Sequence, residues 1–312
     1  MRIAVFGAGG VGGYFGGRLA HAGNEVVFIA RGAHLQAMRE HGLSVKSIQG
    51  DFTVPAVEAT DDPAQVGQVD LVLVAVKAWQ IPEVAPAMRP LMGPATAVVP
   101  LQNGLEAASQ LAAVLGDAAV LGGTCAIYSY IAAPGCIEHM GFEPTVTIGE
   151  RDRMARPRTD TIRQCLQEAG IVAQVAPDIN VPLWEKFFVL RWGIIGAVTR
   201  APAGVLRRLP QMRDMIDQAG REVITVARAH GVSLSDDMLQ RNMELLESLP
   251  PQATTSLQRD VMEGRPSEVD AQAGALVRLG QQVQVPTPLH AFLFHAILPL
   301  ELQARGEIQF AD

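Results

Sequence analysis

Ile3-Ala4-Val5-Phe6-Gly7-Ala8-Gly9-Gly10-Val11-Gly12-Gly13 opens the chain with a short apolar run followed by the pattern G-x-G-x-x-G. The run is typical of a buried strand, and a helix-like segment follows it as far as Ala20. In such a turn the first glycine permits a tight bend, the second lets the backbone approach a pyrophosphate, and the third lets helix and strand pack closely. The pattern therefore predicts a dinucleotide site formed by Gly7, Gly9, Gly10, Val11 and Gly12. A glycine-rich packing turn without a ligand is the alternative.

A second apolar segment, residues 24–30, predicts a strand that ends at Arg31. At this position an acidic residue binds the ribose 2′-hydroxyl of NAD, whereas an arginine accommodates the 2′-phosphate of NADP. No Asp or Glu occurs between Glu25 and Glu40. Arg31 therefore predicts NADP(H) as the cofactor, and a solvent-exposed arginine at a strand end is the alternative.

Two further apolar segments lead to polar residues at what we expect to be one edge of a parallel sheet. Residues 70–76 lead to Lys77, and residues 96–101 lead to Gln102-Asn103-Gly104. Ligands of open α/β sheets bind outside the carboxyl ends of the strands. The glycine turn, Lys77 and Asn103 are therefore predicted to line one crevice.

The remainder of the chain divides into a mixed part and a helical part. Residues 124–150 contain short strand-like pieces and turns, which predict antiparallel strands added at the edge of the sheet. From about Val181 the apolar pattern is helical, with Pro or Gly between segments. We therefore predict an α/β Rossmann-type domain over residues 1–178, an all-helical domain over residues 179–312, and a cleft between them for the substrate.

The composition excludes several classes of protein. Apolar residues make up 48% and charged residues 18%, which favours a large core over disorder. The net charge of −7 provides no basic surface for nucleic acid or an anionic membrane. No apolar stretch is long enough to span a membrane, Met1 leads directly into the first strand without a targeting segment, and no metal site is indicated by the spacing of Cys125, Cys136 and Cys165. We expect a cytoplasmic protein, and the sequence leaves a homodimer open.

Further motifs follow in order along nearly the whole chain. They are V-K-A-W-Q at 76–80, L-Q-N-G at 101–104, G-C-I-E-H-M-G and T-I-G-E within 135–150, W-E-K-F at 184–187, and S-L-Q-R-D-V-x-x-G-R-x-S-E-V-D at 256–270. With the glycine turn and Arg31, these motifs resemble those of the ketopantoate reductase (2-dehydropantoate 2-reductase) family, and the last is the most specific. The resemblance implies NADPH-dependent reduction of a 2-keto acid, as in pantothenate biosynthesis. It also implies a helical domain like the C-terminal domain of 6-phosphogluconate dehydrogenase.

The resemblance implies roles for individual residues. Lys186 matches the family's general-acid lysine, Glu268 matches the carboxylate that meets the substrate hydroxyl, and Ser256 matches a substrate-binding serine. Asn103 matches an asparagine beside nicotinamide and substrate, and Lys77 matches a lysine that lines the same cleft. Hydride transfer to a carbonyl carbon produces an alkoxide, so a proton donor or a cation must lie at that oxygen.

Two positions depart from the family pattern. The family has asparagines four and eight residues after the lysine, where this chain has Leu190 and Ile194. An unpaired buried hydroxyl costs roughly 1–3 kcal/mol, so these apolar side chains fit a hydroxyl-rich ligand poorly. The departure predicts a 2-keto acid or ketone that is bulkier or less polar than ketopantoate.

Two other functions stay open on the sequence alone. A β-hydroxyacid dehydrogenase also combines a Rossmann domain, a helical domain and a helix-borne lysine, but Arg31 and the segment Ser256–Asp270 favour the ketopantoate reductase type. A non-catalytic NADPH-binding regulatory protein would explain the missing asparagines. The presence of both Lys186 and Glu268 argues against it.

Overall fold

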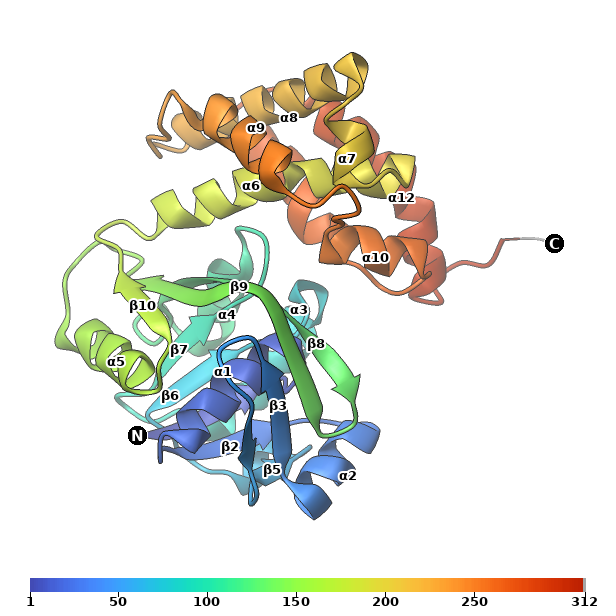
Figure 1. Ribbon diagram of the computed structural model, residues 1–312. Helices are drawn as coiled ribbons and strands as arrows, with labels where there is room; N and C mark the ends of the chain where they lie inside the picture. Colours follow the sequence, from blue (N-terminus) through green and yellow to red (C-terminus); the bar gives the residue numbers. More distant parts are fainter. Residues whose placement is uncertain (311–312) are drawn as a thin grey trace. The chain divides into compact units, whose positions relative to one another are not determined.

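The computed structural model describes residues 1–310, and they form two compact units, drawn in Figure 1. The first unit comprises residues 1–102 and 107–182. The second comprises the short segment Asn103–Glu106 and the chain from Leu183 onward. Each unit has a hydrophobic core of its own.

A five-stranded parallel sheet forms the centre of the first unit. Its strands are β1 (Arg2–Phe6), β2 (Glu25–Ile29), β5 (Glu58–Thr60), β6 (Leu71–Val74) and β7 (Ala97–Pro100). They lie in the order β5-β2-β1-β6-β7, so the strand before the glycine turn is the central one. In the register of the sheet, Val5 lies opposite Phe28 of β2 and Leu73 of β6. The apolar run at the start of the sequence is thus enclosed by strands on both sides.

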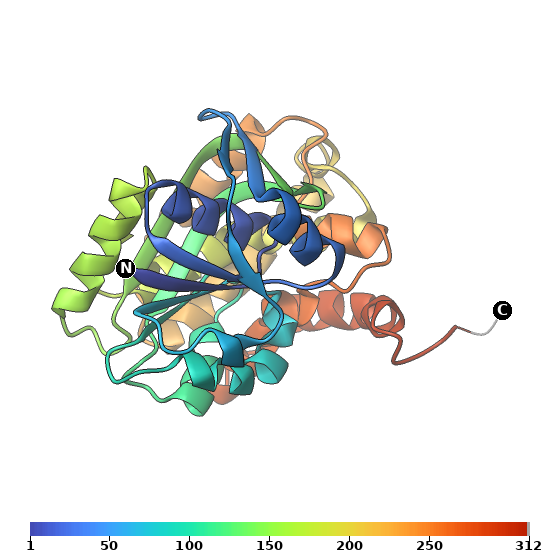
Figure 2. The same cartoon turned by 90° about the horizontal axis from the view of Figure 1, so that it is seen from below.

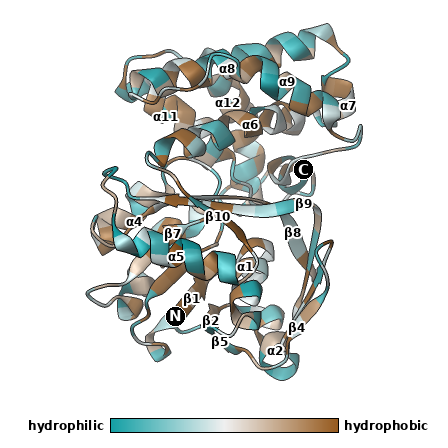
Figure 3. Ribbon diagram, turned by 60° about the vertical axis from the view of Figure 1, so that its left-hand side comes forward, coloured by the Kyte–Doolittle hydropathy of each residue, from teal (hydrophilic) through white to brown (hydrophobic). Residues whose placement is uncertain are grey.

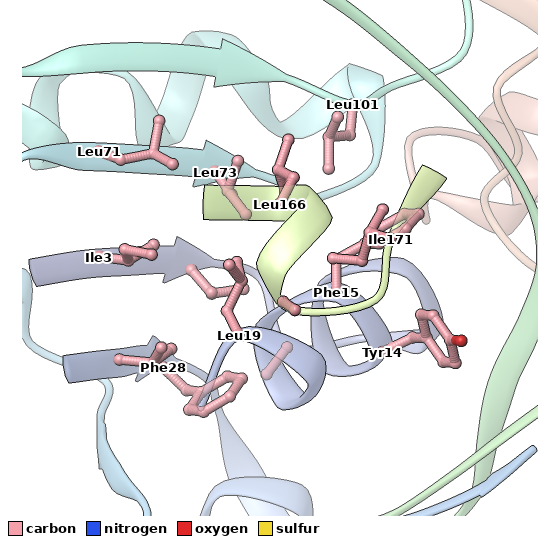
Figure 4. Close-up of a cluster of buried hydrophobic side chains, with 14 of the residues drawn as sticks. Ile3, Tyr14, Phe15, Leu19, Phe28, Leu71, Leu73, Leu101, Leu166 and Ile171 are labelled. Atoms are coloured by element: carbon pink, nitrogen blue, oxygen red, sulfur yellow. The ribbon is translucent and has the colours of Figure 1, made fainter. Parts of the chain in front are cut away.

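Helices cover both faces of this sheet, as Figure 2 shows. Successive side chains of a strand point to opposite faces, and accordingly Ile3 and Val5 belong to one core whereas Ala4 and Phe6 belong to the other. Figure 4 shows Phe15 and Leu19 of the first helix in the first of these cores, with Phe15 beside Ile171. The helices of this unit are α1 (Gly10–His21), α2 (Gly32–His41), α3 (Ile81–Val84), α4 (Ala107–Leu115) and α5 (Pro157–Glu168), with 3-10 turns η1 (Pro63–Gln65), η2 (Ala78–Gln80) and η3 (Pro86–Leu91).

A second sheet accounts for the segment predicted to add strands at the edge of the first. Its strands are β3 (Leu43–Ser47), β4 (Phe52–Val54), β8 (Gly122–Ala133), β9 (Cys136–Gly149) and β10 (Val172–Val175). The predicted antiparallel pairing is present between β8 and β9, but β9 pairs in parallel with β3 and β10, so these strands belong to a separate sheet. Gly141 has φ +90° and lies where the β8–β9 register shifts. Because such an irregularity is absorbed within a strand, β9 continues through it.

The second unit is helical, and no strand occurs among its described residues. Figure 3 shows that α8 and α9 present largely hydrophilic outer faces, as expected for helices that pack on a core along one side only. None of the helices formed by residues 1–310 is long and apolar enough to cross a membrane. The elements are α6 (Asn180–Thr199), α7 (Ala203–Leu206), α8 (Pro210–Ala229), α9 (Met238–Ser248), α10 (Ser256–Met262), the π-helical turn η4 (Asp270–Gly274), α11 (Ala275–Gln282) and α12 (Pro288–Ala304).

A buried arginine holds α6 against its neighbours in this unit. The side chain of Arg191 is almost fully enclosed, and burial lowers its pKa to about 9, so the guanidinium is still charged at neutral pH. Its Nε donates to Ile216 O on α8 at 2.9 Å, and its Nη1 donates to Asn242 Oδ1 on α9 at 2.6 Å. Arg191 Cζ lies 3.8 Å from the centre of the Phe188 ring. A buried cation needs such acceptors, so Arg191 fixes the position of the helix that carries Lys186.

The N-terminus of α12 is held by a carboxylate from α8. Glu222 accepts hydrogen bonds from Leu289 N at 2.8 Å, from His290 N at 3.0 Å and from His290 Nδ1 at 2.7 Å. Burial raises the pKa of the Glu222 carboxyl, but these hydrogen bonds outweigh burial and the pKa is lowered from its ordinary value. The negative charge of Glu222 is also favourable at this helix N-terminus, because the first N–H groups of a helix lack partners within the helix.

Glu222→Gln should therefore destabilise the protein by about 1–3 kcal/mol at pH 7, the usual cost of weakening charged hydrogen bonds. A carboxyl with a lowered folded pKa contributes stability above its unfolded pKa, about 4.3, and loses it as the pH falls through the folded value. The difference between wild type and variant should accordingly shrink below about pH 4. Urea unfolding between pH 7 and pH 3 measures it, with Glu244→Gln on the exposed face of α9 as the control. A difference that grows as the pH falls would contradict this assignment.

Candidate functional site

The turn after β1 requires glycine at two positions. Gly7 has φ +99°, a conformation that favours glycine, and its N–H donates to Ile29 O at 3.0 Å. At Gly12 an added Cβ would lie 2.0 Å from Gly7 O and 3.0 Å from side-chain atoms of Val5 and Ala75. The start of α1 therefore approaches β1 and the neighbouring strand more closely than any side chain would allow.

Gly9 differs from these two because nothing occupies the space beside it. It precedes α1 with an ordinary φ of −69°, and an added Cβ would meet no atom within 4 Å. The first turn of α1 has neither a side-chain cap nor an acidic residue, so its N–H groups are available to an anion. At Gly10, in contrast, a Cβ would lie 2.4 Å from Ser129 O on β8, and Val11 is half-buried against the first core. A pyrophosphate therefore fits beside Gly9, whereas Gly10 also has a packing reason to be glycine.

The predicted phosphate-binding arginine is exposed and has an acidic neighbour. Arg31 is the second residue after β2, and its Nη2 lies 3.7 Å from Glu83 Oε1 on α3, with both side chains about two-thirds exposed. Lys77 follows β6 at the start of η2, where its backbone N–H donates to Gln80 Oε1 at 3.1 Å. The first unit thus has two cationic residues at the carboxyl ends of β2 and β6. It also has a carboxylate that a 2′-phosphate at Arg31 would have to displace.

Asn103 and Glu268 are joined directly. Asn103 Nδ2 donates to Glu268 Oε2 at 2.8 Å, and Glu268 is only 5% exposed. The segment that carries Asn103 is held a second time, because Arg278 Nη2 donates to Glu106 Oε2 at 2.6 Å and Arg278 Nη1 donates to Asp270 Oδ1 at 2.8 Å. The hydrogen bond with Glu106 and the pairing with Asp270 raise the pKa of Arg278, so its charge is permanent.

The other predicted residues of the helical unit are not part of that hydrogen bond. Lys186 is half-buried on α6, and within residues 1–310 its ammonium makes no hydrogen bond or ion pair. Ser256 is exposed as the first residue of α10, where Thr255 supplies the cap by accepting from Gln258 N at 3.2 Å. α6 and this cap approach closely, since a Cβ at Gly193 would lie 2.3 Å from Thr255 Oγ1. α6 and the start of α10 are therefore neighbours.

The two positions that depart from the family pattern have different surroundings. Leu190 is half-buried, whereas Ile194 is 2% exposed and belongs to the core of the helical unit. A side chain enclosed in the core contributes to packing. An asparagine at position 194 would therefore bury its amide without hydrogen-bond partners. Of the two, only Leu190 has surface left for a ligand to contact.

Several residues at these sites are not indicated by the sequence motifs. Glu83 lies far from Arg31 in the chain, and Glu106 and Arg278 are 172 positions apart, so no local pattern connects them. Glu301 does carry a signal, since it is the only acidic residue in the largely apolar helix α12. A single acid in such a helix suggests a buried, paired carboxylate. Among the described residues no cluster of His, Cys, Asp or Glu could hold a metal ion.

A glycine turn at the carboxyl end of the central strand of a parallel sheet defines the class of dinucleotide-binding α/β proteins. Comparisons with known proteins agree. Residues 3–153 match the model of ketopantoate reductase PanE/ApbA, and residues 178–301 match that of its C-terminal domain. A 2-dehydropantoate 2-reductase of Nostoc sp. is 30% identical over 305 residues, which cover 95% of this chain and 94% of the relative.

Solved structures show the same likeness. The 2-dehydropantoate 2-reductase of Geobacter metallireducens has a TM-score of 0.91 at 28% identity, covering 96% of this chain and 99% of its own. A D-mandelate dehydrogenase solved with NADH and anilino(oxo)acetate has a TM-score of 0.89 at 22% identity over 98% of this chain and 99% of its own, a likeness of fold. The chain belongs to the ketopantoate reductase family. It is an NADP-dependent oxidoreductase that acts on a CH–OH group.

Gly9→Ala tests whether the open space at the turn is where the cofactor binds. The added methyl group meets no protein atom, so the free energy of unfolding should stay within about 0.5 kcal/mol of wild type. NADPH affinity should fall at least about tenfold, because the methyl group occupies the place of the pyrophosphate. Fluorescence titration with NADPH and urea unfolding measure the two effects.

Gly12→Ala is the matched comparison, because its methyl group meets backbone and side chains. It should cost about 1–3 kcal/mol of stability through overpacking. A Gly9→Ala protein that binds NADPH as tightly as wild type would place the cofactor elsewhere.

Proposed function

We propose that this protein is an NADPH-dependent reductase of a 2-keto acid that is less polar than ketopantoate. Its likeness to 2-dehydropantoate 2-reductases at about 30% identity supports the reaction class. The two alternatives, a β-hydroxyacid dehydrogenase and a non-catalytic NADPH-binding regulator, lack comparable support from the relatives found.

The observation that carries this proposal is the hydrogen bond between Asn103 and Glu268. Both residues match substrate-site positions of the family, and they come from segments 165 positions apart. The Glu268 carboxylate is buried. Burial of a carboxylate is costly unless hydrogen bonds replace its lost hydration. A substrate hydroxyl is a suitable further donor to it, because an ionised carboxylate has several acceptor positions.

The proposed chemistry assigns one task to each residue. The bound dinucleotide supplies a hydride to the carbonyl carbon of the 2-keto acid. Lys186 donates a proton from its ammonium group to the carbonyl oxygen, which becomes the hydroxyl, and the resulting amine is protonated again from solvent. Glu268 accepts a hydrogen bond from that hydroxyl, and Asn103 holds the Glu268 carboxylate in place.

The choice of substrate is proposed from Leu190. This side chain is half-buried on the same helix as Lys186, one turn further along. An apolar group there favours an alkyl or aryl substituent on the 2-keto acid and leaves a hydroxyl without a partner. Ile194 contributes through the packing of the core.

Lys186→Ala should lower kcat by about 10²–10⁴, the usual contribution of a positioned acid, with little change in NADPH affinity. Lys46→Ala, an exposed lysine on β3, is the control and should leave kcat unchanged. Small primary amines added to the assay should restore part of the lost rate. Near-normal kcat in Lys186→Ala on the best substrate would end this mechanism.

Cofactor preference depends on the balance between Arg31 and Glu83. NADPH should bind at least about tenfold more tightly than NADH, equivalent to about 1.4 kcal/mol, and Arg31→Ala should remove most of that difference. Glu83→Gln should increase the preference, because the 2′-phosphate then meets no neighbouring carboxylate. The dissociation constants of NADPH and NADH, measured for the wild type, Arg31→Ala and Glu83→Gln, test this expectation. Equal constants for the two cofactors in the wild type would refute the preference for NADPH.

Leu190→Asn tests the proposed preference for a 2-keto acid that is less polar than ketopantoate. An amide at this half-buried position should raise kcat/KM for ketopantoate by about tenfold, because it can pair with a substrate hydroxyl. The same change should lower kcat/KM for a 2-keto acid with an alkyl side chain. Steady-state NADPH oxidation with both substrates measures the ratio. An unchanged ratio would show that Leu190 does not contact the substrate.

A further inference from the structure

The carboxylate of Glu301 is buried near the end of α12, where it is 3% exposed. Ser267 provides most of its hydrogen bonds, since the backbone N–H of Ser267 lies 3.1 Å and 2.9 Å from the two carboxylate oxygens and Ser267 Oγ donates to Oε2 at 2.5 Å. Arg305 Nε donates to Oε1 at 2.7 Å. A buried charge with this many donors is fully compensated, so the contact is a rigid one.

Ser267 also holds the backbone of Val269, the residue that follows Glu268. Ser267 is fully buried, and its Oγ accepts a hydrogen bond from Val269 N at 3.2 Å. The backbone N–H of Ser267 is thus held by Glu301, and the backbone N–H of Val269 is held by the Ser267 hydroxyl. Glu268 lies between the two anchored residues.

The backbone before Glu268 is irregular, whereas the Glu268 carbonyl accepts a hydrogen bond from Gln272 N at 3.0 Å and so begins the helical backbone that follows. Residues 265–267 form neither helix nor strand, and the π-helical turn η4 begins only at Asp270. The side chain of Glu268 nevertheless has a defined partner, since Oε2 accepts from Asn103 Nδ2 at 2.8 Å. A carboxylate on an irregular segment keeps one position only if the segment itself is anchored.

We propose that Glu301, acting through Ser267, is a positioning residue for Glu268 and thereby sets the affinity of the site for the 2-keto acid. Glu301 does not touch the substrate; it fixes the backbone from which Glu268 extends. The inference rests on the proposed function, because it takes Glu268 as the residue that meets the substrate hydroxyl.

Ser267→Ala is the most direct test, because it removes the hydroxyl and keeps the backbone N–H that donates to Glu301. Misplacement of a binding group by about 1 Å can cost up to about 10²-fold, and we expect KM for the 2-keto acid to rise about tenfold or more. The dissociation constant of NADPH should not change, since Gly9 and Arg31 are in the other unit. Ser267→Thr retains the hydroxyl and should restore KM toward the wild-type value.

Glu222→Gln is the matched control for a loss of stability alone. Glu222 is also a carboxylate that accepts backbone and side-chain hydrogen bonds at α12, but at its N-terminal end and without contact to Ser267. Measured at equal folded fraction, it should leave KM at the wild-type value. An equal rise of KM in Glu222→Gln and Ser267→Ala would overturn the positioning role.

The double variant Ser267→Ala with Glu268→Gln separates this inference from the proposed function. If Ser267 acts through Glu268, Ser267→Ala should add nothing to the KM of Glu268→Gln. Additive effects, or a Ser267→Ala enzyme with normal KM beside an impaired Glu268→Gln, would overturn the positioning role alone. A Glu268→Gln enzyme with normal KM and kcat would instead refute the substrate role of Glu268, and the positioning role with it.

Discussion

A buried carboxylate is the constraint that organises the candidate site of the helical unit. Glu268 is 5% exposed, and removal of a charge from water is costly unless hydrogen bonds replace the lost hydration. Asn103 supplies one such bond. Around this pair the chain provides two ionic anchors, with Arg278 holding the segment of Asn103 through Glu106 and Glu301 holding the residue before Glu268. Charged side chains thus fix the segments on both sides of the Asn103–Glu268 hydrogen bond.

The first unit depends on a different constraint, the absence of side chains. Gly12 brings α1 against β1, and Gly7 turns the chain between them. The same closeness leaves open space at Gly9, where the N–H groups of α1 have no side-chain acceptor. One short stretch of sequence therefore produces both the packing of the unit and its anion-binding position, which is why it predicts fold and cofactor together.

The sequence predicts the parts of this protein that are set by local patterns. Apolar runs and the glycine turn predict the parallel sheet and the helical second part, and the order of motifs identifies the family. The sequence predicts antiparallel strands at the edge of the first sheet, whereas β8 and β9 belong to a separate sheet, because β9 pairs with β3 and β10 and no local pattern encodes such distant partners. Glu83 has no local signal, since it acts on a residue far away in the chain. Glu301 does have one, because it is the only acidic residue of a largely apolar helix. The site roles, the cytoplasmic location and a homodimer stay predictions.

The central claim is that this chain transfers a hydride from NADPH to the carbonyl carbon of a 2-keto acid. NADPH carrying deuterium at both C4 positions of the nicotinamide tests this transfer, when it is incubated with the enzyme and a 2-keto acid with an alkyl side chain. We expect one deuterium at C2 of the 2-hydroxy acid product, detected by mass spectrometry and NMR, for each NADPH consumed. NADPH that binds without being oxidised by any 2-keto acid, or a product without deuterium at C2, would contradict it.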